Sequence, residues 1–255
     1  MSECNLSATD SNQVVISDVT KRFGQRLILD QISLAIHAGE TVALIGPSGG
    51  GKSTLLRCIN GLCEFDEGQI RVGPHMLHPA SPRMTRRQVR RLFGMIFQDF
   101  QLFPHMTALQ NVIEAPMQVL KLSKLEARQR GMALLERVGL GDRTDAYPRQ
   151  LSGGQKQRVS IARALAMQPR GLLCDEITSA LDPELKAEVL ATIENLKRDG
   201  LTLILVTHEI GFARRAADRV VVLADGKIAE HGPPADVLDN PQTPRTQRFL
   251  SQVMV

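Results

Sequence analysis

The feature that most constrains the fold is a short apolar run followed at once by a glycine-rich loop. Residues Thr41–Ile45 have the composition of a β-strand, and they lead into GPSGGGKST, residues 46–54. A strand, a loop of this pattern and a helix in succession form the phosphate-binding loop of nucleotide-binding α/β proteins. The strand therefore belongs to a sheet that positions a phosphate group at the start of a helix.

This loop supplies several groups that bind a di- or triphosphate. Its glycines let backbone N–H groups converge, and the helix N-terminus adds a positive partial charge. We expect Lys52 to reach the β- and γ-phosphates and the Ser53 hydroxyl to coordinate Mg²⁺. A plain glycine turn is the alternative, and the Lys-Ser pair at this offset argues against it. The expected nucleotide-binding residues are Gly46, Ser48, Gly49, Gly50, Gly51, Lys52, Ser53 and Thr54.

Two adjacent acids follow another apolar run, Leu172-Leu173-Cys174. Adjacent carboxylates at the end of a buried strand are costly unless a positive group offsets them. Mg²⁺ provides that charge, so we interpret Asp175 as a ligand of the metal or of its water. Glu176 is then the base that polarises the attacking water. The alternative for Glu176 is a solvated residue at a strand end.

A third segment, Leu151-Ser152-Gly153-Gly154-Gln155, begins a predicted helix. Its serine N-cap and two glycines present backbone N–H groups, which makes a second anion site distinct from the first. Taken alone, the segment could be only a helix cap.

The sequence LSGGQKQRVSIARALAM, residues 151–167, resembles the signature segment of ABC-type ATPases. Together with the phosphate-binding loop and the Asp-Glu strand, it identifies the chain as a member of that superfamily from about residue 14 to residue 255. QDFQLFPHMTALQNVIEAP, residues 98–116, and the tail around residues 240–246 resemble most the ATP-binding subunits of bacterial polar amino-acid importers.

The resemblance assigns four further residues. Gln98 resembles the loop glutamine that senses the γ-phosphate and Mg²⁺, and His208 resembles the switch histidine that touches the γ-phosphate. Asp182 resembles the D-loop aspartate that links two sites, although it also suits the N-cap of a helix beginning at Pro183. Phe23 stands where the family places an aromatic ring that stacks on adenine. Without the resemblance these residues read as a surface amide, a structural histidine, a helix cap and a core aromatic.

The resemblance also implies an assembly. The chain would hydrolyse ATP as a homodimer that pairs head to tail, with Mg²⁺ held by Ser53, Gln98 and, through water, Asp175. Ser152, Gly153, Gly154, Gln155 and Asp182 of one copy would close over the nucleotide held by the other. The dimer would dock onto transmembrane permease subunits, fed by a solute-binding protein, on the cytoplasmic face of the inner (plasma) membrane. No nucleic acid is expected as a partner.

The fold class implied is a P-loop ATPase core with a mainly parallel sheet, an N-terminal antiparallel β subdomain and an inserted α-helical subdomain. We expect residues 1–13 to be a flexible tail and residues 14–255 to form a single domain, with the helical subdomain at about residues 100–165. Capping-box spacing predicts helices after Thr107 and Ser123. Expected strands are Val14–Val19, Ile32–Ile36, Gln69–Val72, Gly171–Cys174, Leu201–Val206 and Arg219–Ala224. The segment after Asp225 is expected to be short and terminal.

Composition narrows the class of protein further. The net charge of +4, from 31 Lys and Arg against 27 Asp and Glu, does not point to nucleic acid or to an anionic membrane surface. Apolar runs are far shorter than the roughly 20 residues that cross a bilayer. The four cysteines form neither a metal-finger spacing nor a secreted framework, which favours a reducing setting.

Two rival functions stay open on sequence grounds. One is a soluble ABC protein bound to nucleic acid or ribosomes, for which the five arginines between Arg83 and Arg91 could be a contact, although a solvated helix face is the simpler interpretation. The other is an ABC ATPase that serves a different small solute. Ile177 and Asp99 depart from the common family pattern, since a proline usually follows the glutamate and an uncharged residue usually follows the glutamine.

Overall fold

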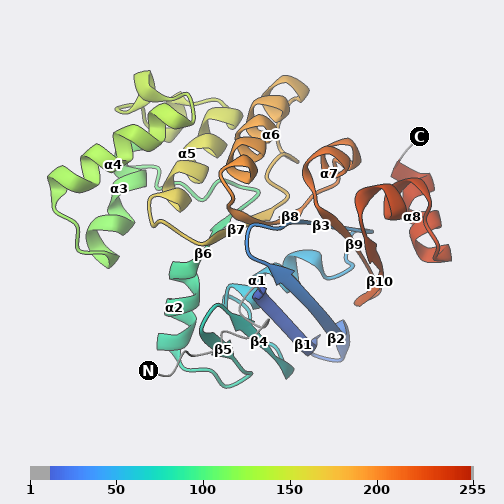
Figure 1. Ribbon diagram of the computed structural model, residues 1–255. Helices are drawn as coiled ribbons and strands as arrows, with labels where there is room; N and C mark the ends of the chain where they lie inside the picture. The colour runs from blue at the N-terminus through green and yellow to red at the C-terminus, as the bar shows by residue number, and fades with distance from the viewer. Residues whose placement is uncertain (1–11, 254–255) are drawn as a thin grey trace, which may run out of the picture.

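The computed structural model describes residues 12–253, in which strands and helices alternate through most of the chain (Figure 1). Residues 1–11 of the expected tail lie outside this part, and residues 12 and 13 belong to the first strand. The strands are β1 (Asn12–Phe23), β2 (Arg26–His37), β3 (Thr41–Ile45), β4 (Glu67–Val72), β5 (His75–Leu77), β6 (Phe93–Ile96), β7 (Gly171–Asp175), β8 (Thr202–Val206), β9 (Arg219–Ala224) and β10 (Lys227–Gly232). The helices are α1 (Lys52–Ile59), α2 (Arg83–Leu92), α3 (Ala108–Val119), α4 (Lys124–Arg137), α5 (Gly153–Leu165), α6 (Pro183–Arg198), α7 (Ile210–Ala216) and α8 (Pro244–Val253).

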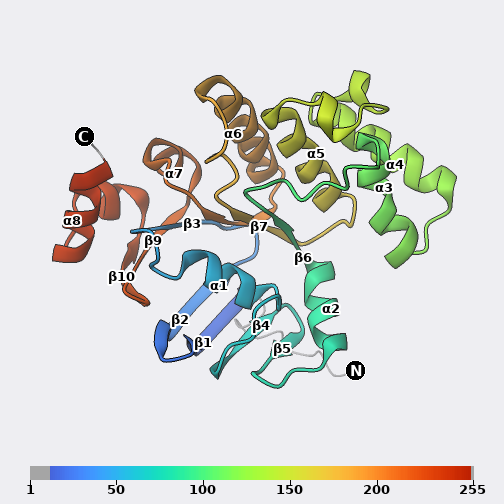
Figure 2. The same ribbon diagram turned by 180° about the vertical axis from the view of Figure 1, so that it is seen from behind.

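The main sheet has six strands in the order β10-β9-β3-β8-β7-β6. All neighbours in it are parallel except β10 and β9, so the expected mainly parallel sheet is confirmed. Every residue of β3, β7 and β8 is buried, because both faces of the sheet are covered. Helices α5, α6 and α7 lie on one face, and α1 lies on the other with the second sheet (Figures 1 and 2).

The side chains of the central strands alternate between these two faces, as the period of two in a strand requires. Leu172 and Cys174 pack with the helices, whereas Leu173 between them packs with α1 and the second sheet. Each face therefore has its own apolar core, and the strands between the cores are held in one register.

The second sheet is antiparallel and has the order β2-β1-β4-β5. It confirms the expected N-terminal β subdomain, and β1 and β2 are longer than the sequence pattern indicated. Their alternate apolar side chains, such as Val14, Ile16 and Ile36, face α1 and are fully or almost fully buried. This packing fixes the start of α1 between the two sheets.

The inserted helical part contains α3, α4 and α5, which pack on one another at one end of the molecule (Figure 1). Both expected capping boxes form. Thr107 and Gln110 exchange hydrogen bonds at the start of α3, and Ser123 and Glu126 do so at the start of α4. Local sequence signals of this kind need no distant partner, which is why they could be recognised in advance.

Several elements were not expected from the sequence. β5 and β6 have only three and four residues, and β6 follows α2 with no turn between them. The region after Asp225 is more ordered than expected. β10 forms the edge strand of the main sheet, and a π-helical turn at Ala235–Asp239 and α8 pack beside it. Phe249 and Leu250 of α8 are buried in this contact.

The arginine-rich segment forms α2, in which only Val89 is buried. Arg86 pairs with Glu64, and Arg83, Arg87, Arg90 and Arg91 are exposed, as expected for a solvated helix face. Within residues 12–253, no helix combines the length and apolar character needed to cross a bilayer.

We expect Gly131→Ala to destabilise the helical part. A methyl group there would lie 2.5 Å from Cγ2 of Ile113 and 2.8 Å from Cδ1 of Leu109, both on α3. Overpacking of this kind costs about 1–3 kcal/mol, which exceeds the gain of up to about 1 kcal/mol in helix propensity. The free energy of unfolding in urea should therefore fall.

Gly211→Ala in α7 is the matched control. Its nearest neighbour would be the end of the Arg215 side chain at 3.8 Å, so stability should be unchanged or slightly higher. An equal effect of the two substitutions would contradict the close packing of α3 on α4.

Candidate active site

The carboxyl ends of four parallel strands bring the predicted catalytic residues together. The phosphate-binding loop follows β3, Glu176 follows β7, His208 comes shortly after β8, and Gln98 comes shortly after β6. Parallel strands end at the same edge of a sheet, and the loops at this edge commonly form the ligand site. Two adjoining cavities of about 270 and 640 Å³ open here, and both are lined by Ser53 and Glu176.

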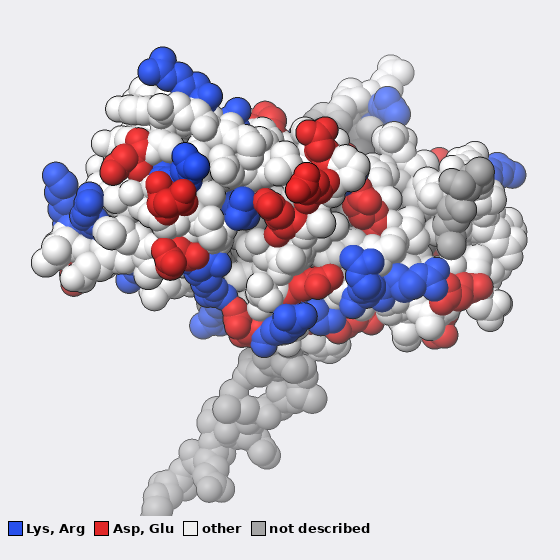
Figure 3. Space-filling view, turned by 90° about the horizontal axis from the view of Figure 1, so that it is seen from above, with Lys and Arg blue, Asp and Glu red and all other residues white. Residues whose placement is uncertain are grey.

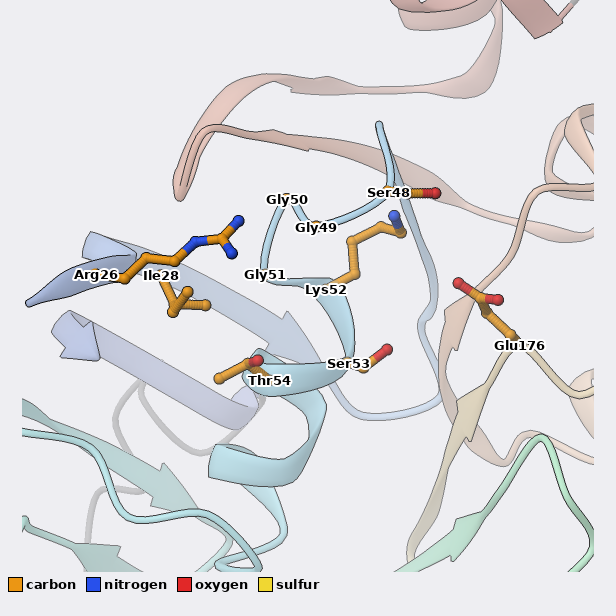
Figure 4. A pocket seen from close by; sticks show the side chains of 10 residues that line it. All are labelled: Arg26, Ile28, Ser48, Gly49, Gly50, Gly51, Lys52, Ser53, Thr54 and Glu176. Carbon is orange, nitrogen blue, oxygen red and sulfur yellow. The ribbon is translucent and has the colours of Figure 1, made fainter. Parts of the chain in front are cut away.

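The phosphate-binding loop wraps around the start of α1, with the Lys52 side chain on its inner side (Figure 4). The Lys52 ammonium group donates hydrogen bonds of 2.9 Å to the carbonyls of Gly46 and Pro47, and the residue is only 4% exposed. Burial lowers the pKa of this ammonium, while the charges of Glu176 and Asp175 act in the opposite direction. The loop thus holds a cation ready for an anionic ligand.

Glycine is required at two points of this loop by its backbone geometry. Gly46 has a φ of 137°, and a Cβ there would lie 2.1 Å from the carbonyl oxygen of Leu223 in β9. Gly51, at the N-cap of α1, has a φ of 97°, and a Cβ there would lie 2.8 Å from both the Ile28 carbonyl oxygen and Leu29 Cδ2 of β2. The loop is therefore clamped between the two sheets, which fixes its backbone N–H groups.

Asp175 is the point at which the loop and the strand β7 are joined. It is 4% exposed, and its Oδ1 accepts a hydrogen bond of 2.6 Å from the Ser53 hydroxyl. Arg57, one turn further along α1, lies 3.4 Å from Oδ2 of the same carboxylate. A buried carboxylate is stable here because a hydroxyl and a guanidinium group partner it. Arg57 was not anticipated from the sequence.

Glu176 and His208 face each other across the ends of β7 and β8. His208 Nε2 lies 2.9 Å from Glu176 Oε1, and the Glu176 side chain remains about a quarter exposed to the cavity. Glu176 has a left-handed backbone with a φ of 49°, which is uncommon for a residue with a side chain. Its N–H group donates to the carbonyl of Val206, so the backbone that carries the carboxylate is anchored to β8.

The donors that would hold Mg²⁺ line one cavity. Ser53, Gln98 and Asp175 all face the larger one, and they supply hydroxyl, amide and carboxylate oxygens. Oxygen donors of this kind are those that Mg²⁺ prefers, and the hydrogen bond between Ser53 and Asp175 already places two of them side by side. The residues present therefore fit the metal.

Phe23 lies at the tip of the β1–β2 hairpin, directly across from Arg26. Cross-strand partners leave the same face of a sheet, and Arg26 and Ile28 line the smaller cavity. Phe23 is about half exposed, with the Lys21 ammonium 4.9 Å from its ring centre. It thus lies beside the cavity rim rather than in the core. The sequence did not indicate Arg26 and Ile28 as cavity residues, because the β1–β2 hairpin reaches the phosphate-binding loop only when the chain folds.

The segment expected to form a second anion site lies apart from these cavities. Ser152 caps α5, and its capping box with Gln155 occupies the N–H of Gln155 and the amide oxygen of its side chain. Of the backbone N–H groups expected to bind an anion, those of Gly153 and Gly154 remain outside the capping box. None of residues 152–155 lines the two cavities described above. Asp182 occupies the expected N-cap position of α6, which begins at Pro183, but its side chain makes no capping hydrogen bond.

Helix α5 is tied to the loop that carries Gln98. Arg163 donates to the carbonyls of Phe100 and Gln101, at 3.0 and 2.5 Å, and Gln157 donates to the carbonyl of Phe97 at 3.3 Å. Phe100 and Gln101 both have left-handed backbones, so this loop is held in an unusual conformation. Hydrogen bonds therefore join α5, which Ser152 caps, to the loop that carries Gln98.

The two departures from the family pattern have distinct settings. Ile177 is buried in the apolar core under the helices, so its side chain contributes packing that a proline would not supply in the same way. Asp99 lines the larger cavity, and its carboxylate accepts a hydrogen bond of 2.6 Å from the Gln101 amide.

Comparisons with known proteins agree with this geometry. A family model described as ABC transporter matches residues 29–179. The glutamine transport ATP-binding protein of Geobacillus stearothermophilus is 47% identical, over 94% of this chain and 99% of that protein. The arginine transport ATP-binding protein of Corynebacterium glutamicum is 49% identical, over 92% of this chain and 96% of that protein. A solved dimeric ATP-binding cassette bound to ADP and Pi superposes with a TM-score of 0.78 at 35% identity, covering 87% of this chain and 98% of that one.

We expect Arg26→Ala to weaken ATP binding about five-fold, roughly 1 kcal/mol, because an exposed guanidinium at the rim of a phosphate site contributes a modest charge-assisted contact. Isothermal titration calorimetry with ATP measures this change in Kd. Arg22→Ala removes the same charge one residue from the hairpin tip, away from the cavity lining, and should leave Kd unchanged. Equal Kd values for wild type and Arg26→Ala would exclude the contact.

Proposed function

The chain belongs to the ABC transporter family of ATP-binding proteins, and on this premise we propose that it powers import of a polar amino acid by binding and hydrolysing ATP. The observation that carries the proposal is the convergence of Lys52, Ser53, Asp175, Glu176 and His208 on one edge of the sheet. The glutamine and arginine transport relatives support amino acids as the cargo.

The site residues divide the hydrolytic work among them. Lys52 and the loop N–H groups bind the phosphates and offset their charge. Ser53, Asp175 and Gln98 would hold Mg²⁺, which would offset the negative charge of the phosphates. Glu176 orients the attacking water and accepts its proton, and His208 holds the Glu176 carboxylate in place and reaches the γ-phosphate.

Closure of a homodimer is the second part of the proposal. One chain carries a phosphate-binding loop and, on a separate element, the N–H groups of Gly153 and Gly154 at the start of α5. In a head-to-tail pair, Ser152, Gly153, Gly154, Gln155 and Asp182 of one copy lie over the nucleotide of the other. Gln155 acts mainly by keeping Ser152 in place. ATP joins the copies, and hydrolysis lets them part.

The proposed partners are transmembrane permease subunits, with a solute-binding protein that delivers cargo to them. The chain would be a peripheral protein on the cytoplasmic face of the plasma membrane. The loop of Gln98 is the proposed link, because it faces the cavity and is held by α5. A nucleic-acid partner is not favoured, since one broad face carries both charge signs (Figure 3) and Arg86 of α2 is paired.

We expect Glu176→Gln to lower ATP turnover at least about 100-fold, because the base that accepts the proton of water is lost. ATP binding should persist, so a stable dimer should accumulate in ATP. Phosphate release and size-exclusion chromatography with light scattering measure the two effects. The control Glu67→Gln, at an exposed position of β4, should change neither ATP turnover nor the oligomeric state. A Glu176→Gln chain that stays monomeric in saturating ATP would refute ATP-dependent dimerisation.

The transport assignment is tested by what co-purifies with the tagged chain after extraction in mild detergent. We expect mass spectrometry to identify a multi-span membrane protein, and uptake of labelled polar amino acids to fall when the chain is deleted. Recovery of ribosomes or DNA-bound proteins with no membrane partner would contradict the proposal. If deletion of the chain instead lowers uptake of a different class of solute, the assignment as an ATPase stands and the proposed amino-acid cargo is wrong.

A further inference from the structure

Two cysteine side chains lie against each other at the C-terminal end of α1, apart from the residues of the ATP site. The chain reverses after the helix through the left-handed residue Gly61. The N–H groups of Leu62 and Cys63 both donate to the carbonyl of Arg57, at 2.9 and 3.0 Å. This tight helix end returns Cys63 to the side of Cys58, and Cys63 packs against the apolar core that contains Cys58. The Cys63 Sγ also lies 3.4 Å from the carbonyl oxygen of Glu64, to which it donates.

The two thiols have different surroundings. Cys58 is fully buried in the core between α1 and the antiparallel sheet, whereas Cys63 is half-buried at its edge. The hydrogen bond from Cys58 lowers the pKa of Cys63 to about 6, burial opposes this, Lys21 and Arg57 add to it, and Asp66 opposes it. The same hydrogen bond and burial raise the pKa of Cys58. A half-buried cysteine with a lowered pKa thus lies beside a buried cysteine with a raised pKa.

We propose that Cys63 and Cys58 form a peroxide-sensitive dithiol, in which Cys63 is oxidised first and Cys58 closes a disulfide. This arrangement has the two parts that such sites need, an attacking cysteine that solvent reaches and a resolving cysteine beside it. Cys174 is not suited to be an attacking thiol, because it is fully buried in β7 and burial raises its pKa.

The chemistry balances with hydrogen peroxide as the oxidant. The Cys63 thiolate attacks one peroxide oxygen, the O–O bond breaks, and the leaving hydroxide takes up a proton to become water. The Cys58 sulfur then attacks the Cys63 sulfur, an S–S bond forms, and the S–O bond breaks. The departing hydroxide takes the Cys58 proton. The two thiols lose two electrons, which the peroxide gains. Neither ATP nor a partner is needed, so the proposal stands apart from the proposed transport function.

The site lies near the catalytic residues without including them. Arg57, next to Cys58, pairs with Asp175, and Leu62, next to Cys63, lines the larger cavity. Oxidation would therefore act on the end of the same helix that begins with Lys52.

The test uses the folded full-length chain with Cys4→Ser, treated with a small molar excess of hydrogen peroxide. Remaining thiols are alkylated under denaturing conditions before digestion with trypsin. Cleavage after Arg57 and Arg71 places both cysteines in peptide 58–71, and Cys174 falls in peptide 171–186. We expect peptide 58–71 to be lighter than its reduced form by two hydrogen atoms and to carry no alkyl group, whereas peptide 171–186 is alkylated.

Two variants separate the roles of the thiols. In Cys58→Ser, Cys63 should stop at a sulfenic acid that dimedone traps. In Cys63→Ser, Cys58 should stay reduced. Without peroxide, iodoacetamide should alkylate Cys63 at least about 10-fold faster than Cys174 in the folded chain. An alkylated peptide 58–71 after peroxide treatment of the parent chain, or a sulfinic acid on Cys63 beside a free Cys58, would overturn the proposal.

Discussion

The hydrogen bond of 2.6 Å from Ser53 to Asp175 joins two segments that lie 122 residues apart, and the site depends on it. The bond forms because β3, β8 and β7 run parallel and end at one edge, so the loop after β3 meets the end of β7 across β8. The burial that covers both faces of these strands also makes an unpartnered carboxylate costly. Hydroxyl and guanidinium groups on α1 remove that cost, and they leave Asp175 beside oxygen donors suited to Mg²⁺.

A second physical link runs from the cavity to the helical part. Arg163 and Gln157 of α5 hold the backbone of the loop that carries Gln98, and the same helix begins at Ser152. In the proposed dimer, a movement of α5 would therefore displace both the N–H groups of Gly153 and Gly154 and the loop that carries Gln98. Such a connection would let closure of the dimer and occupation of the cavity influence each other.

Local signals in the sequence predicted the parts of the fold that need no distant partner. β3 and β9 have the expected bounds, and the capping boxes at Thr107 and Ser123 form as their spacing indicates. The short strands β5 and β6 were missed because three or four residues carry no periodicity. Arg26 and Arg57 were missed for another reason, since Arg26 reaches the cavity only when the hairpin packs beside the loop, and Arg57 reaches Asp175 only when α1 packs beside the end of β7. The positions of Lys52 and Asp175 followed from motif context, whereas the contact between Glu176 and His208 required the order of β7 and β8.

In the proposed dimer each nucleotide site is shared between two copies, and complementation between two variants measures this sharing. Lys52→Ala removes the phosphate-binding lysine, and Ser152→Asp keeps a helix cap while placing a negative charge where phosphate would bind. A head-to-tail mixed dimer then has one site with both halves intact, although neither variant alone has any. An equimolar mixture should recover ATP turnover to roughly a quarter of the wild-type value, since half of the dimers are mixed and each has one intact site of two. A mixture no more active than either variant alone would contradict a shared site.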